Sequence, residues 1–147
     1  MVARVLTAIL AVCVAAAVAV GCGSSAPTPL TKTAFIKQGN AICVHATKAR
    51  DAALAKAVKQ GSQGSNQEEL QHYVSTVALP PIQVMTEELG GLGPPKGDEK
   101  KVEALIGEFE AGIAALEKDP SKALAHESVF TGANEMAIAY GLTDCTI

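Results

Sequence analysis

The stretch that decides the fold is VEALIGEFEAGIAAL, residues 102–116. Because an α-helix turns once in about 3.6 residues, apolar residues three or four positions apart share one face. The apolar residues of this stretch have that spacing: Val102, Leu105, Ile106, Phe109, Ile113 and Leu116. The stretch therefore predicts an amphipathic helix that begins at Asp98 or its neighbour and ends at Asp119-Pro120.

Two further helices are predicted before it. Residues 33–60 carry an apolar stripe at helical spacing, and the polar loop of residues 61–65 ends this first helix. Asn66, with Glu69 three positions later, is typical of a capping box and marks the start of the second helix. The stripe of the first helix consists of Phe35, Ile42, Ala46, Ala49, Ala53 and Ala57.

The second helix meets the pair Pro80-Pro81. Each proline lacks a backbone N–H donor and disfavours helical backbone in the residue before it. We therefore expect the helix to run to about Leu79, to break or kink sharply, and to resume with Ile82. The glycine- and proline-rich residues 90–97 form the next loop.

A fourth helix is expected after Asp119, with Asp119 or Ser121 as its cap and Pro120 near its first position. Gly141 is typical of a left-handed helix stop. Four amphipathic helices joined by short loops favour an all-α fold, an antiparallel up-down four-helix bundle with a Pro-Pro kink in or after the second helix. The stripe of the fourth helix is Ala123, Phe130, Ala133, Ala137 and Tyr140.

The first 21 residues are typical of an export signal. A single charge, Arg4, precedes the weakly polar to apolar run of residues 5–20. A membrane-spanning helix is the alternative, but spanning needs about 20 apolar residues, and this run is rich in small Ala and Val. No basic cluster follows the run, so we expect removal of residues 1–21 rather than a permanent span.

The sequence Ala19-Val20-Gly21-Cys22 resembles the lipobox of bacterial lipoproteins. In that family the cysteine is acylated, with chains such as palmitate, and becomes the new N-terminus. Ala19 departs from the usual Leu or Val, and an ordinary secretory cut after Ala19 is the competing interpretation, which would release a soluble secreted protein. Residues 22–32 have the composition of a flexible tether, which leaves residues 33–147 as the folded body.

Counting the cysteines supports lipidation of Cys22. The chain has four of them, and Cys13 lies in the signal. If Cys22 carries lipid, Cys43 and Cys145 remain, and an oxidising compartment favours a disulfide between them. The alternative is a pair of free buried thiols. In an up-down bundle the two cysteines can meet, provided that residues 141–144 fold back along the bundle.

Composition excludes nucleic acid as a partner. The chain has a formal net charge of −3 at neutral pH, and beyond residue 21 only 11 basic residues face 15 acidic ones. No basic run is present, and an acidic body repels phosphate backbones. An acidic body also repels anionic lipid heads, so the folded body need not touch the membrane.

Catalytic and metal-binding interpretations find little support. The chain lacks Gly-x-Ser-x-Gly, Cys-x-x-Cys-His, His-x-x-x-His and Glu-x-x-His patterns, so we predict no enzyme, no catalytic residue, no metal site and no cofactor. The alternative is a haem or metal carrier that uses histidine and methionine side chains within the bundle. Its candidate ligands are His45, His72 and His126, and surface positions are the simpler interpretation of all three.

A set of short motifs resembles a group of small actinobacterial lipoproteins. The motifs are Phe35-x-x-x-x-Asn40-Ala41-Ile42-Cys43, Leu79-Pro80-Pro81, the Gly-Pro-Pro-x-Gly-Asp loop and Tyr140-Gly141-Leu142-x-x-Cys145. The resemblance implies a secreted helical bundle with one disulfide, and it carries over no catalytic residues. Together these observations predict a protein held by lipid on the extracytoplasmic face of the cell membrane. There it would act as a non-enzymatic binding module for an envelope protein or a small apolar ligand, with a groove where the first helix faces Pro80-Pro81.

Overall fold

The computed structural model describes residues 29–61 and 66–147, and every regular element within them is helical. The predicted all-α class is therefore confirmed. The signal segment, Cys22 and most of the tether lie outside the described residues. The elements, in chain order, are α1 (Lys32–Lys59), α2 (Gln67–Tyr73), the π-helical segment η1 (Val74–Ala78), α3 (Leu79–Gly91), α4 (Glu99–Lys118), the 3-10 turn η2 (Pro120–Leu124) and α5 (Thr131–Tyr140).

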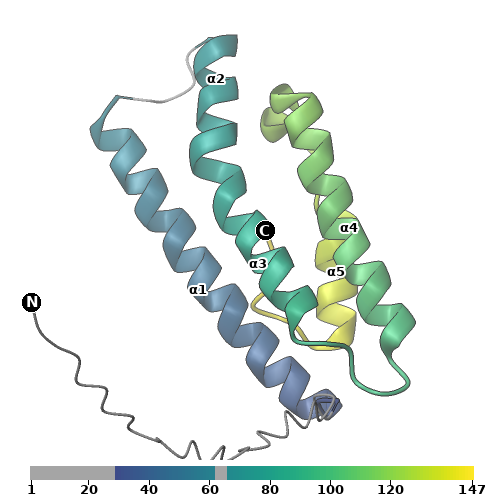
Figure 1. The fold of residues 1–147 in the computed structure, drawn as a ribbon. Helices are drawn as coiled ribbons and strands as arrows, with labels where there is room; N and C mark the ends of the chain where they lie inside the picture. The colour runs from purple at the N-terminus through teal and green to yellow at the C-terminus, as the bar shows by residue number, and fades with distance from the viewer. Residues whose placement is uncertain (1–28, 62–65) are drawn as a thin grey trace, which may run out of the picture.

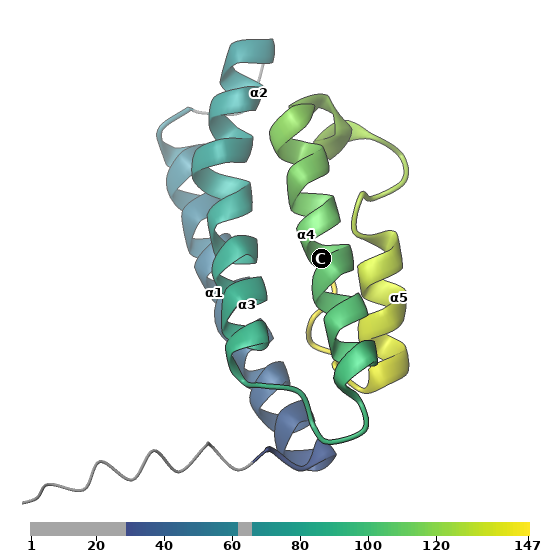
Figure 2. The same ribbon diagram turned by 45° about the vertical axis from the view of Figure 1, so that its right-hand side comes forward.

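The helical rods lie side by side in both views of the ribbon (Figures 1 and 2). α1 packs against α3, α3 against α4, and α4 against α5. The start of α1, the loop between α3 and α4, and the end of α5 share the lower end of Figure 1. α2 and η2 lie at the opposite, upper end.

α1 begins close to the predicted residue, where the Thr31 hydroxyl caps it by accepting a hydrogen bond from the Ala34 N–H at 3.2 Å. Its buried face includes Phe35 and Ala57 of the predicted stripe, with Ile42 and Ala46 packed at the edge of the core. The first half of α1 buries Phe35, Gly39 and Cys43, whereas Ala49 of the predicted stripe is exposed. An alanine adds so little apolar area that its position does not decide which face of a helix turns inward.

The backbone stays helical through Pro80 and Pro81, because α2, η1 and α3 follow one another without a gap. The predicted break is therefore wrong. The wider π turn just before the prolines replaces it, and within this turn the Leu79 N–H donates to the carbonyl of Val74. A π turn shifts the hydrogen-bond register by one residue, which accommodates the proline rings and missing donors without ending the helix.

α4 agrees with its sequence pattern. Asp98 is the residue before its first turn, and its carbonyl accepts hydrogen bonds from the N–H groups of Lys101 and Val102. The apolar stripe forms the centre of the core, where Phe109 is fully buried and Ile106 lies at the edge. The buried members of the stripe are Val102, Leu105, Phe109, Ile113 and Leu116.

The predicted fourth helix is shorter than expected. Pro120 opens only the 3-10 turn η2, the chain is extended at Ala125, and α5 starts at Thr131. Ser128 explains the interruption, because its hydroxyl accepts from the Phe130 N–H and its carbonyl from the Thr131 N–H. Serine that bonds to nearby backbone in this way competes with helical pairing. The predicted stop at Gly141 is confirmed by its φ of 104°.

The aromatic residues of the core come in two pairs. Phe35 of α1 meets Tyr140 of α5 edge-to-face, with ring centroids 5.8 Å apart. Phe109 of α4 meets Phe130 just before α5, at 6.4 Å. Both pairs tie α5 to a longer helix, which compensates for the short length of α5. Among the described residues, no helix has the length and apolarity that crossing a bilayer requires.

Candidate functional site

The cysteine pair predicted from the sequence is joined in the structure. Cys43 of α1 and Cys145 beyond α5 form a disulfide, with their Cα atoms 4.9 Å apart and both residues buried. As expected, the chain after Gly141 folds back along the bundle, and Leu142 enters the core. The bond therefore fixes the C-terminal tail, residues 141–147, against α1.

Two asparagines that the sequence analysis did not single out for a role hold the same tail. The Asn40 amide donates to the Gly141 carbonyl and accepts from the Asp144 N–H, each at 3.1 Å. The Asn134 amide bonds in the same two-way manner to the N–H and carbonyl of Ile147, each at 2.9 Å. Each side chain thus supplies hydrogen-bond partners for backbone groups of the tail, which has no helix or strand to supply them.

Gly39 provides the space in which the tail packs. A Cβ atom at this position would lie 2.5 Å from Cδ2 of Leu142 and 3.2 Å from Cδ2 of Leu89. Leu142 is completely buried because α1 presents bare backbone there. Gly39, which would weaken an isolated helix, is here a contact surface.

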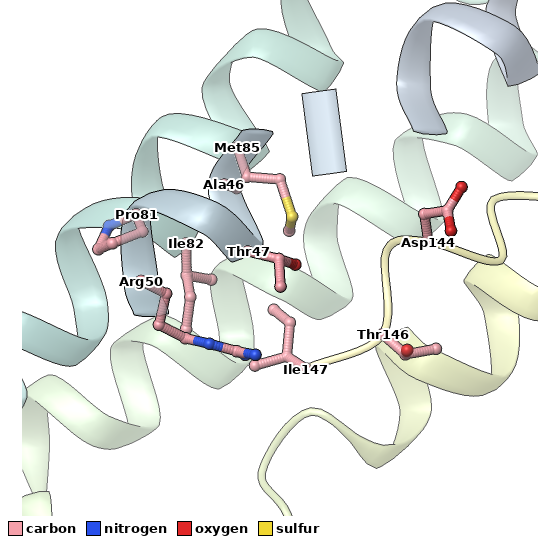
Figure 3. A pocket seen from close by; sticks show the side chains of 9 residues that line it. All are labelled: Ala46, Thr47, Arg50, Pro81, Ile82, Met85, Asp144, Thr146 and Ile147. Atoms are coloured by element: carbon pink, nitrogen blue, oxygen red, sulfur yellow. The ribbon is translucent and has the colours of Figure 1, made fainter. Parts of the chain in front are cut away.

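The groove expected between α1 and the proline pair is closed. Ala46, Thr47 and Arg50 of α1 face Pro81, Ile82 and Met85 of α3 across it. Figure 3 shows Ile147 of the tail reaching toward Thr47 and Arg50. The free space that remains is about 10 Å³, which is room for about one water molecule. This seam is therefore a packed contact between the tail and two helices.

An open groove lies elsewhere, between the beginning of α4 and the end of α5, and encloses about 460 Å³. We call it the lysine groove, because lysines form one side of it while its other residues are mostly apolar. Its lining residues are Lys32, Lys100, Lys101, Ala104, Met136, Ala139 and Tyr140. The volume falls in the range of small-molecule sites.

Asp98 organises the charges beside this groove. Its carboxylate accepts a hydrogen bond from the Tyr140 hydroxyl at 3.1 Å and pairs with the Nζ atoms of Lys101 at 2.9 Å and Lys32 at 3.4 Å. The Lys32 ammonium also sits 4.5 Å from the centre of the Tyr140 ring, within range of a cation–π contact. One acidic group thus positions two lysines and one tyrosine.

The same contacts shift two pKa values. The hydrogen bond from Lys101, with that from Tyr140 and the two ammonium charges, holds the pKa of Asp98 below its usual value. Burial, together with the hydrogen bond to the Asp98 carboxylate, raises the pKa of Tyr140 to about 12. Around neutral pH the site therefore keeps a neutral phenol hydrogen-bonded to a carboxylate, next to lysine side chains and an apolar surface.

Two further hollows lie toward the upper end. One, of about 290 Å³, separates the last turns of α1 from His72, Tyr73 and Thr76. The other, of about 470 Å³, lies between Leu70 of α2 and the exposed Leu124 of η2. Both lie between elements that contact each other elsewhere along their length, α1 with η1 and α2 with η2.

The structure places the three histidines apart from the core. His45, His72 and His126 are all exposed, as the simpler interpretation predicted, and they lie on α1, on α2 and after η2. The described parts of the chain contain no group of three or more histidine, cysteine or acidic residues close enough to hold a metal ion. Met85 is a buried core residue, whereas Met136 lines the lysine groove.

Comparisons with known proteins bring no relative to this arrangement: no protein-family model, no curated protein and no solved structure matches the chain.

Proposed function

We propose that this chain is a lipid-anchored, non-enzymatic binding module on the extracytoplasmic face of the cell membrane, related to the small actinobacterial lipoproteins that it resembles. Cleavage before Cys22 would leave an acylated cysteine, a tether of residues 22–32 and the folded body of residues 33–147. We further propose that the helices form an antiparallel up-down four-helix bundle, bent near Pro80-Pro81. The neighbour order α1, α3, α4, α5 supports that arrangement.

The cysteine inventory supports the anchor. The folded body uses Cys43 and Cys145 for its disulfide. Cys13 lies inside the signal sequence, so Cys22 remains as the single cysteine available for acylation. Two or more acyl chains on one residue hold a protein at a bilayer for long times, whereas one chain holds it weakly.

The lysine groove is the observation that carries the binding role. It is open, it has the volume of a small-molecule site, and apolar side chains share its lining with ammonium groups. The Tyr140 hydroxyl of the groove donates to the Asp98 carboxylate, but the pKa of Tyr140 is raised to about 12, which disfavours the phenolate that nucleophilic chemistry needs. Binding of a partner or a small molecule is therefore the function that its chemistry supports best.

The test of the anchor is the mass of the mature N-terminal peptide from membrane fractions. The expected peptide begins at Cys22 and carries the mass of acyl chains. A peptide that begins at Val20 or Gly21 would contradict the proposal and establish a soluble secreted protein instead.

The binding role is tested by crosslinking in the intact envelope and by native mass spectrometry of the protein purified from it. We expect a crosslinked envelope protein or a co-purified small molecule, with contacts at Ala139 and Met136 of the lysine groove. A clean spectrum together with an absence of crosslinks would remove the support for a binding module.

A further inference from the structure

The charges of this protein are unevenly distributed between its two ends. We define the lysine end as Lys32 together with residues 96–101, which contain Lys96, Lys100 and Lys101 beside Asp98 and Glu99. Lys32 starts α1, and residues 96–101 comprise the end of the loop before α4 and the first turn of α4. Both segments lie at the lower end of Figure 1. The lysine end therefore has four basic and two acidic residues. Elsewhere beyond residue 21, seven basic residues face thirteen acidic ones.

The positive charge of the lysine end is accessible. The side chains of Lys101 and Lys32 remain 67% and 50% exposed although both pair with Asp98. Lys100 is exposed and has no ion pair within the described residues. Since one carboxylate is shared by two ammonium groups, the cluster keeps a surplus of positive charge that an external anion can meet.

Apolar surface adjoins these lysines. Ala104, Ala139 and Met136 line the lysine groove next to the ammonium groups, so a ligand here meets charge on one side and an apolar strip on the other. Lysine side chains suit such a boundary, because their hydrocarbon stems lie on apolar surface while their ammonium groups reach a polar layer. A phospholipid layer is complementary to this arrangement, because its phosphate groups can meet the ammonium groups while its acyl chains meet the apolar strip.

The chain enters the fold at the lysine end. Lys32 is the first residue of α1, ten residues beyond Cys22. Ten residues span at most about 35 Å even when fully extended. An acyl chain on Cys22 therefore keeps the lysine end within about 35 Å of the bilayer, whereas the far end of α1 lies a further helix length along the chain.

We propose that the lysine end docks on the anionic phospholipid headgroups of the membrane in which Cys22 is anchored. Lys100, Lys101 and Lys32 contact the headgroup phosphates, and Met136 and Ala139 rest at the headgroup level. The inference rests on the proposed lipid anchor. It revises the expectation, drawn from average net charge, that the folded body need not touch the membrane.

Native lysines at both ends provide the test without any label. The full protein, purified from membranes, is reconstituted in phosphatidylcholine vesicles with or without phosphatidylglycerol and treated with an amine-acylating reagent. Lys100 should react about fivefold more slowly on the anionic vesicles than on the neutral ones, since a headgroup contact worth about 1 kcal/mol per lysine slows it by that factor. Lys118 and Lys122, at the end of α4 and in η2, are the internal controls and should change less than about twofold.

A pair of matched variants sharpens the test. Lys100→Gln with Lys101→Gln should release the lysine end, so that the protection of Lys32 on anionic vesicles, about fivefold in the wild type, is lost. Lys118→Gln with Lys122→Gln removes the same charge from the upper end and should leave that protection unchanged. Sodium chloride at about 0.5 M should abolish the protection, because it screens exposed charges.

The other outcomes contradict the docking. Equal protection of both ends, or stronger protection of Lys118 and Lys122, would overturn it. Protection of Lys100 that persists on neutral vesicles, together with a co-purified acyl compound, would assign the groove to a carried amphiphile instead of the bilayer. The digest also reports the mass of the Cys22 peptide, so an absent anchor is recognised separately from a failed docking.

Discussion

The two halves of α1 differ in how much of their surface is buried. The first half buries Phe35, Gly39 and Cys43, contacts the tail and carries the disulfide. The second half buries only Ala57, and its larger side chains Leu54 and Val58 are 42% and 52% exposed. A single helix thus runs from a tightly held lower end to a loosely held upper end.

This difference follows from the distribution of partners. At the lower end, α1 meets α3, the end of α5 and the tail, and the asparagine contacts and the disulfide all lie in this region. At the upper end it faces the short α2 across a hollow of about 290 Å³. Local stability depends on buried contacts, so we expect the upper half to open more readily than the lower.

Reduction of the disulfide should have the largest effect on this contrast. Cys43 and Cys145 are 102 residues apart, and a loop of that size contributes about 4 to 5 kcal/mol by restricting the unfolded chain. The free energy of unfolding, measured by urea titration with and without dithiothreitol, should fall by this amount. The variant Cys43→Ala with Cys145→Ala is the control, because dithiothreitol should not destabilise it further. A fall below about 1 kcal/mol would show that the tail is held by its noncovalent contacts instead.

The substitution Gly39→Ala should be next in size. Its added methyl group would press on Leu142, and overpacking of this kind costs about 1 to 3 kcal/mol. Gly107→Ala in α4 is the matched control, since nothing lies within 4 Å of the new Cβ and alanine favours a helix over glycine by about 0.5 to 1 kcal/mol. Urea titration should therefore show opposite signs. Equal stabilisation by both variants would contradict the close approach of the tail.

The substitution Tyr140→Phe should cost about 1 kcal/mol at neutral pH, the net value of one hydrogen bond, here that to Asp98. Folding raises the pKa of Tyr140 from 10.0 to about 12, so the neutral phenol is favoured in the folded state. Its contribution is complete below pH 10 and is lost as the pH rises to about 12. Wild-type stability should fall over that window, and Tyr140→Phe should lack this part of the fall. Tyr73→Phe, in the upper half, is the control and should retain the wild-type profile.

The smallest effect is expected at the upper end of α1. Leu54→Ala should change the free energy of unfolding by no more than about 0.5 kcal/mol, as exposed substitutions usually do. The same change at the fully buried Leu89 of α3 should cost about 2 to 5 kcal/mol. Urea titration of the two variants measures the difference directly. A large loss at Leu54 would mean that a partner or a second copy covers this surface.

The sequence predicts the helices well where large apolar side chains repeat. The stripe of α4 correctly identified the side that this helix buries, because only one face of a helix can bury Val102, Leu105 and Phe109 together. In α1 the same reasoning found Phe35 and Ala57, which are buried, but missed Gly39 and Cys43 and wrongly included Ala49. Its alanines fit several phases, while Gly39 and Cys43, the residues that actually make the contacts, do not register as strongly apolar.

The candidate site was predictable only in part. Cysteine counting found the pairing of Cys43 with Cys145, which the structure contains. The lysine groove could not be found in that way, because Lys32, Lys100 and Met136 come together only when three helices take their places. The i, i+4 spacing of Lys100 with Ala104 and of Met136 with Tyr140 places each pair on one face of its helix. The sequence does not show that these two faces lie against each other, because that depends on the tertiary packing.

The disulfide also determines how this protein would carry mechanical load. Tension between the proposed anchor at Cys22 and the end of the tail at Ile147 would run along α1 to Cys43, cross the covalent bond, and leave through Cys145. Residues 44–144 lie outside that path. A partner pulling on the tail could therefore unwind little more than the first turns of α1, while α3 and α4 bear none of the force. Reduction would convert this short, stiff link into an extensible one that draws on the whole chain.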